Sequence, residues 1–119
     1  MNLLIEFFRG DYFEYRFRLL DEDDTSIRLS ENDNLILTVK KHITNNNYVI
    51  QKRLSDGIEW DESSQCYVVY FNHTDTNTLV AADYDFDIVI VWEGTKPETH
   101  KGKIKLMQDV TRNEVSGDG

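Results

Sequence analysis

Apolar and polar residues alternate with a period of two along most of the chain, which is the pattern of half-buried β-strands. Segment 13–19 alternates aromatic or aliphatic residues with charged ones. Segment 84–92 keeps one face apolar throughout, and segment 66–71 is apolar at nearly every position, which is typical of a central strand. Shorter alternating runs cover 35–40, 48–53 and 103–107. Roughly six or seven strands at this spacing predict a β-sandwich or a β-barrel.

Polar turn residues separate these runs. Asp21–Ser26, Asn45–Asn47 and Asp56-Gly57 are turn sequences, and Pro97 lies in the last hairpin loop because proline cannot donate to a central ladder. Segment 73–79 interrupts the alternation with helix N-cap residues and ends at an apolar residue, which predicts one short helical turn near 74–79. A helical fold is disfavoured, since no segment repeats apolar residues with helical spacing over three turns.

The composition fits one folded domain. The chain has 119 residues, of which 39% are hydrophobic and 12% aromatic, too many for a disordered protein. We expect one domain over residues 1–112 and a flexible C-terminal tail over 113–119, which is polar and contains glycine. No apolar run approaches the roughly 20 residues that span a bilayer, and the N-terminus has no basic leader. The net charge of −9 weighs against nucleic acid and anionic membranes as partners.

Two short motifs are candidate binding sites, and both are weak. Arg9-Gly10-Asp11 spells the integrin-binding tripeptide, but it directly precedes a predicted strand, where Gly10 serves as a turn residue. Asp21–Asp24 offers carboxylates for calcium. An EF-hand loop counted from Asp21 needs glycine and glutamate where the chain has Ser26 and Asn32, so we interpret the run as a solvated turn.

The residue types used in catalysis do not form a recognisable arrangement. His42, His73 and His100 lie in different segments without a partner at helical spacing, and Cys66 lies inside a predicted strand, where a buried structural thiol is expected. The sequence therefore predicts no catalytic residue, no cofactor site and no metal site. An enzyme would require His73 or His100 in a cleft beside a carboxylate.

The tryptophans are candidates for different roles. Trp92 continues the apolar face of segment 84–92, so we expect it in the core or at its rim. Trp60 is flanked by Glu59, Asp61 and Glu62, which indicates partial exposure, and an exposed tryptophan is a candidate for a protein contact.

The order of several motifs resembles a known family. An aromatic strand follows Arg9-Gly10-Asp11, and an acidic turn follows that strand. The further matching segments are Leu35 to Lys41, Asp56-Gly57-Ile58, Thr74 to Leu79, Ala82 to Ile88, Gly102 to Leu106 and Asp109 to Arg112. Together they resemble the immunoglobulin-like domain at the N-terminus of the upper baseplate protein of siphophages. The sequence departs from that family at two places. Asp83 precedes Tyr84 where the family often has glycine, and the Thr-Asp-Thr turn is offset, so that Asn77 lies near the usual aspartate position.

The resemblance implies an all-β, immunoglobulin-like antiparallel β-sandwich of about seven strands. It implies a non-enzymatic structural protein of a phage or prophage virion, made in the bacterial cytoplasm and placed in the tail or baseplate. Its partners would be other virion subunits, with a homo-oligomer possible. The alternative is a surface adhesion or carbohydrate-binding module, which exposed Trp60, Tyr67 and Tyr70 side by side would favour. Whether segment 2–8 pairs within its own chain or with a neighbouring chain is left open.

Overall fold

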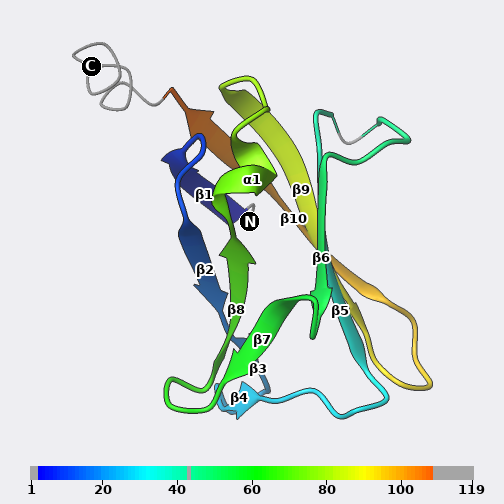
Figure 1. The fold of residues 1–119 in the computed structure, drawn as a ribbon. Helices are drawn as coiled ribbons and strands as arrows, with labels where there is room; N and C mark the ends of the chain where they lie inside the picture. The colour runs from blue at the N-terminus through cyan, green and yellow to red at the C-terminus, as the bar shows by residue number, and fades with distance from the viewer. Residues whose placement is uncertain (1–2, 43, 109–119) are drawn as a thin grey trace.

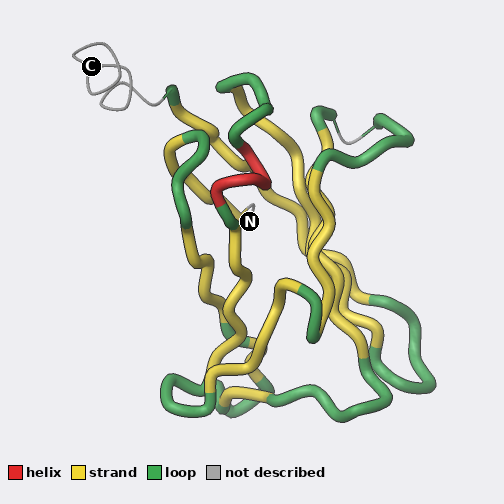
Figure 2. Tube along the Cα trace, in the orientation of Figure 1, coloured by secondary structure: helices red, strands yellow, loops and turns green. Residues whose placement is uncertain are grey.

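The computed structural model describes residues 3–42 and 44–108, and these form a mostly β fold with one short helix (Figures 1 and 2). The all-β prediction is confirmed. The strands are β1 (Leu3–Phe8), β2 (Phe13–Phe17), β3 (Leu19–Leu20), β4 (Ser26–Ile27), β5 (Asn34–Lys40), β6 (Ile50–Leu54), β7 (Gly57–Asp61), β8 (Cys66–Phe71), β9 (Ala82–Val91) and β10 (Glu98–Met107), and the helix is α1 (His73–Thr76). The predicted tail over 113–119 and the predicted domain end at residue 112 lie outside the described residues.

Eight strands form one sheet in the order β1-β10-β9-β5-β6-β7-β8-β2, and β3 and β4 form a separate ribbon. Most neighbours are antiparallel, as expected, but β1–β10 and β6–β7 are parallel. Segment 2–8, which the sequence left open, contains β1, and Leu3 to Phe8 pair with Gly102 to Met107 of the same chain. This additional strand brings the sheet to eight rather than about seven.

The sheet bends back on itself at its weakest joint. Only two residue pairs join β6 to β7: Arg53 with Gly57, and Leu54 with Ile58. Beyond this joint β7, β8 and β2 face the remaining strands across a shared core, as Figure 1 shows. The first and last strands of the sheet, β1 and β2, meet through the stacked rings of Phe7 and Phe13, so the sheet is nearly barrel-shaped.

Aromatic side chains on the inner face of β2 fill the space between the two halves of the sheet. Phe13 stacks on Phe7 of β1 with ring centroids 4.7 Å apart, and Tyr15 meets Phe86 of β9 edge-on at 6.4 Å. Phe17 stacks on the inward-facing ring of β8. The alternation along segment 13–19 therefore identified the strand face that closes the fold.

Opposite charges on the outer face of β9 and β10 match the register of that pair. Asp83, Asp85 and Asp87 lie opposite Lys105, Lys103 and Lys101, respectively. The Lys103 ammonium lies 2.6 Å from the Asp85 carboxylate. A slip by one residue would turn this charged row into the core, so the charges favour the observed pairing.

Helix α1 connects β8 to β9 and is held from both sides. It is shorter than predicted, since Asn77 and Thr78, which are weak helix formers, follow it as a turn. The carboxylate of Asp75 accepts hydrogen bonds from the Asn72 backbone N–H and from Lys52, each at 2.7 Å. After the helix, the Tyr84 hydroxyl donates to the Val80 carbonyl at 2.6 Å and ties the connection to the start of β9.

Gly102 is the residue on which the contact of β1 with β10 depends. A Cβ atom there would lie 2.5 Å from Cε1 of Phe86 and 2.6 Å from the Leu3 carbonyl oxygen. We expect Gly102→Ala to lower the free energy of unfolding by about 2 kcal/mol, because either the core or β1 must shift. Urea unfolding measures this. Gly94→Ala is the control, since space is open there and only its positive φ of 78° opposes a side chain. A smaller loss for Gly102→Ala than for Gly94→Ala would contradict this account.

The Lys52–Asp75 pair gives a second stability prediction. The two side chains are only 11% and 21% exposed. Asp75→Ala leaves a largely buried ammonium without its partner, so we expect a loss of about 3 kcal/mol in urea unfolding. Lys52→Met should lower the free energy of unfolding clearly less, because the methionine side chain fills the space of the lysine methylene groups and carries no charge. Equal losses for the two variants would show that the buried charge is not the cause.

Candidate functional site

A groove of about 360 Å³ opens beside Trp60 and is the best candidate site among the described residues. It lies where the segment between β4 and β5 approaches the β6–β7 turn. Its lining residues are Arg28, Leu29, Ser30, Glu31, Leu54, Ser55, Ile58, Glu59, Trp60 and Tyr67. We call it the Trp60 groove. A volume of this size is in the range of sites that hold a small ligand or an inserted side chain.

Trp60 is half-buried and held on several sides. Its ring meets Tyr67 edge-on at a centroid distance of 5.0 Å, and its indole N–H donates to Glu62 at 2.8 Å. The guanidinium of Arg28 lies over the ring, 5.6 Å from its centroid. The predicted partial exposure of Trp60 agrees with its position, and a fixed aromatic ring of this kind is suited to a contact surface.

Tyr67 forms an inner wall of the groove. It is 1% exposed, and its hydroxyl accepts a hydrogen bond from the Leu29 N–H at 2.7 Å. Burial raises the pKa of Tyr67, so its hydroxyl stays neutral at physiological pH. Tyr67 therefore supplies a rigid, neutral wall.

Charged side chains of both signs line the groove. Glu31 and Glu59 are exposed and belong to its lining, and Arg28 is the basic residue among them. No histidine or cysteine lines it. Ser30 donates to Asp33 at 3.0 Å, so its hydroxyl has a structural partner. The groove thus combines apolar and aromatic walls with an acidic edge.

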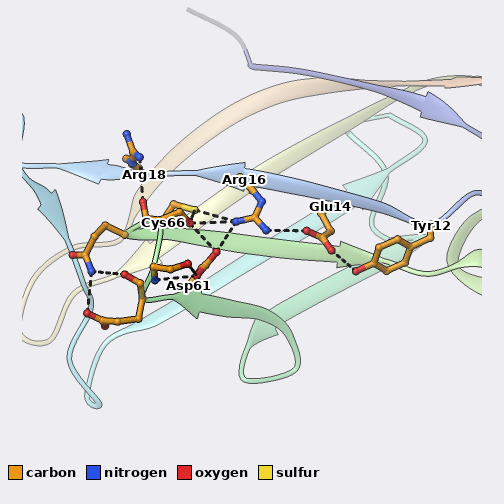
Figure 3. A network of polar contacts seen from close by, with 10 residues as sticks. Tyr12, Glu14, Arg16, Arg18, Asp61 and Cys66 are labelled. Carbon is orange, nitrogen blue, oxygen red and sulfur yellow. Dashed lines mark hydrogen bonds and ion pairs between the residues drawn. The ribbon is translucent and has the colours of Figure 1, made fainter.

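A network of polar contacts covers the outer surface of β2, β7 and β8 (Figure 3). Arg16 is its centre and contacts Asp61 at 2.7 Å and Glu14 at 3.0 Å. Glu14 also accepts the Tyr12 hydroxyl at 2.6 Å, and Ser64 donates to Asp61 at 2.7 Å. The hydrogen bond to Glu14 raises the pKa of Tyr12 to about 12. All these polar groups are paired with one another, which indicates a structural role.

The network also covers Cys66, the one cysteine of the chain. Cys66 is buried, with its sulfur 3.1 Å from the Ser64 hydroxyl oxygen and 3.8 Å from a nitrogen of Arg16. Arg18, directly after β2, donates to the Ser64 carbonyl at 3.1 Å. The predicted buried position of Cys66 is confirmed.

None of His42, His73 and His100 lines the groove. Nδ1 of His73 lies 2.8 Å from the Gly10 carbonyl oxygen, and its Nε2 lies near the Asn77 amide. Nε2 of His100 lies 2.6 Å from the Glu98 carboxylate, but both side chains are about half exposed on the β10 strand. Among the described residues no group of three His, Cys, Asp or Glu side chains is placed to hold a metal ion.

Arg9-Gly10-Asp11 forms a turn that packs on α1. Gly10 is buried, its N–H donates to the Thr76 hydroxyl at 2.7 Å, and Arg9 donates to the Leu79 carbonyl at 3.4 Å. This turn does not present the tripeptide as a protruding loop. The acidic run at 21–24 is a turn, as predicted, in which the Asp21 side chain accepts the N–H groups of Asp23 and Thr25.

The sequence singled out Trp60, and it named Tyr67 only as a possible sugar-stacking ring. Tyr67 is the pairing partner of Trp60 in the β7–β8 hairpin. Arg28 and Leu54 come from other segments, and the sequence did not indicate that they lie beside Trp60. The one local signal was the polar flank of Trp60, which includes Glu62, its hydrogen-bond partner.

Comparison with known proteins adds no relative. No family model matches the chain, and no curated protein matches it. Within residues 3–42 and 44–108, no helix is both long and apolar enough to cross a bilayer.

The Arg16 network predicts a dependence of stability on pH. Its hydrogen bonds hold the pKa of Asp61 well below its usual value, and those from Tyr12 and Arg16 lower the pKa of Glu14. The folded state therefore binds fewer protons than the unfolded state. The stability that these groups contribute is present above the unfolded pKa values of about 4 and is lost as the pH falls below them.

We expect Arg16→Met to flatten this acid dependence between about pH 5 and pH 2, measured by urea unfolding at each pH. Arg18→Met is the matched control, because Arg18 contacts a carbonyl rather than a carboxylate. An equally steep loss of stability with acid in wild type and Arg16→Met would refute the assignment.

Proposed function

We propose that the chain is an immunoglobulin-like β-sandwich that serves as a structural subunit of a phage or prophage tail and acts through protein–protein contact. The strand order supports the fold. The run β10-β9-β5-β6 corresponds to strands G, F, C and C′ of a variable-type immunoglobulin domain, and β7-β8-β2 corresponds to D, E and B.

The hydrogen bond of Tyr84 supports the same fold. It links the start of β9 to the carbonyl four residues upstream, where such domains have a tyrosine corner between strands E and F. Phe86 follows two residues later, in the position of the second core cysteine of antibody domains, and packs against Tyr15 of β2. An aromatic contact thus stands where those domains have a disulfide.

The observation that carries the functional proposal is the Trp60 groove. Tryptophan and arginine are among the residues that most often dominate the energy of protein contacts, and Trp60 and Arg28 meet there against the buried ring of Tyr67. The exposed Glu31 and Glu59, together with the net charge of −9, favour a basic neighbour. The motif resemblance supplies the setting, a phage tail or baseplate.

The carbohydrate-binding alternative is less favoured by the same residues. Sugars stack on exposed aromatic faces, whereas Arg28 lies over the ring of Trp60 and Tyr67 is buried. Tyr70 is on the opposite face of β8, since it follows Tyr67 by an odd number of residues. The three rings therefore do not form one exposed platform.

Quantitative mass spectrometry of tail particles purified from the cells that encode this chain tests the role. We expect the chain at a small, fixed ratio to the major tail protein. Its absence from assembled particles, with the protein abundant in the same cells, would refute the structural role.

Charge reversal at the groove tests the surface. We expect Glu59→Lys to reduce the amount of chain in particles about tenfold, the equivalent of about 1.4 kcal/mol in binding, without lowering its melting temperature. Glu6→Lys makes the same charge change on the outer face of β1, away from the groove, and should be incorporated normally. Equal incorporation of the two variants would exclude the Trp60 groove as the contact.

A further inference from the structure

One part of strand β10 has a neighbour on only one side. The strand runs from Glu98 to Met107, but β1 covers only Gly102–Met107. The first part, Glu98–Lys101, pairs with β9, and within the described residues no strand lies along its other edge. Every residue from Glu93 to Lys101 is exposed, and Figure 1 shows this hairpin projecting away from the rest of the fold.

The direction of the backbone groups at this edge follows from the pairing of β10 with β1. The Met107 carbonyl accepts a hydrogen bond from the Arg9 N–H at 2.8 Å, so it points towards the β1 side. Backbone direction alternates along a strand, and the register with β9 is continuous from Glu98 to Leu106. The N–H and C=O groups of Thr99 therefore point away from β9, towards the uncovered edge. The N–H of Lys101 points the same way, whereas its carbonyl faces the Leu3 N–H of β1.

We propose that a second copy of the chain pairs with this edge, antiparallel and about a two-fold axis that passes through Thr99. This inference rests on the assembly role proposed above and adds one specific contact to it. Thr99 of each copy would exchange two N–H···O=C bonds with Thr99 of the other. Each Lys101 N–H would donate to the Pro97 carbonyl of the second copy.

The side chains favour this register. Residues directly opposite in an antiparallel pair share one face, so Glu98 of one copy faces His100 of the other. Within one chain the Glu98 carboxylate already lies 2.6 Å from Nε2 of His100. No two acidic and no two basic side chains are directly opposite, and Pro97, which lacks an N–H, falls at the end of the paired segment. A register centred on His100 would instead oppose two histidines and extend to Gly102, where β1 is already bound.

Sedimentation velocity from about 10 µM to 1 mM tests the pairing. We expect a weak, reversible dimer for the wild type. Thr99→Pro should be monomeric, because it removes the central donor of each copy, yet it should fold, because that N–H makes no bond to β9. Thr99→Ala keeps the backbone bonds and should dimerise. A monomeric wild type at 1 mM, or an undiminished dimer with Thr99→Pro, would overturn the proposal.

A charge exchange tests the register. We expect E98K and H100E each to weaken the dimer about tenfold. E98K places a lysine opposite His100, and H100E places a glutamate opposite Glu98, so each variant loses the match across the axis. The double variant E98K/H100E places opposite charges there again and should restore the dimer. Failure of the double variant to dimerise better than both single variants would contradict this register. A monomeric chain that is nevertheless present in particles would overturn only this interface. A dimer that is absent from particles would overturn the proposed function instead.

Discussion

The fold depends on the aromatic inner face of β2. This strand is the last of the sheet and has a single hydrogen-bonded neighbour, β8. Phe13 and Tyr15 reach from it across the core to β1 and β9, and Phe17 stacks on the ring of Tyr67 in the neighbouring β8. Because the backbone does not join β2 to β1 as sheet neighbours, the contacts of Phe13 and Tyr15 close the nearly barrel-shaped sheet around its core. Aromatic rings suit this task, since each buries a large apolar area and pairs of rings add further attraction.

Polar interactions then hold the parts that the core does not reach. The Lys52–Asp75 pair ties α1 to β6, and the Arg16 network covers the outer surface of β8. Among the described residues, the Trp60 groove forms a hollow in the surface, and the first part of β10 has no neighbouring strand along one edge. The proposed contacts lie on these two surfaces, one with a basic neighbour and one with a second copy.

The sequence predicted the strands and the closing aromatic face, because residue alternation is a local signal. It also predicted the short helical turn, the buried Cys66 and the partial exposure of Trp60. It missed the parallel pairings and the Trp60 groove, because each depends on contacts between distant segments. Arg28 and Trp60 are 32 positions apart, and nothing in their immediate neighbours indicates that they meet. The phage role and the immunoglobulin-like topology rest on motif resemblance and on the features that support it, and they stay proposals.

The most direct test of the central claim, that the chain works through contacts at these two surfaces, is amide hydrogen exchange of the chain in intact particles compared with the dilute isolated chain. The account predicts that assembly slows exchange at residues 28–31 and 58–60 of the Trp60 groove and at Thr99 and Lys101 of the β10 edge, while α1 and the turn at 21–25 stay unchanged. Slowed exchange confined to other parts of the chain, with the groove and the β10 edge exchanging as in the isolated chain, would contradict it.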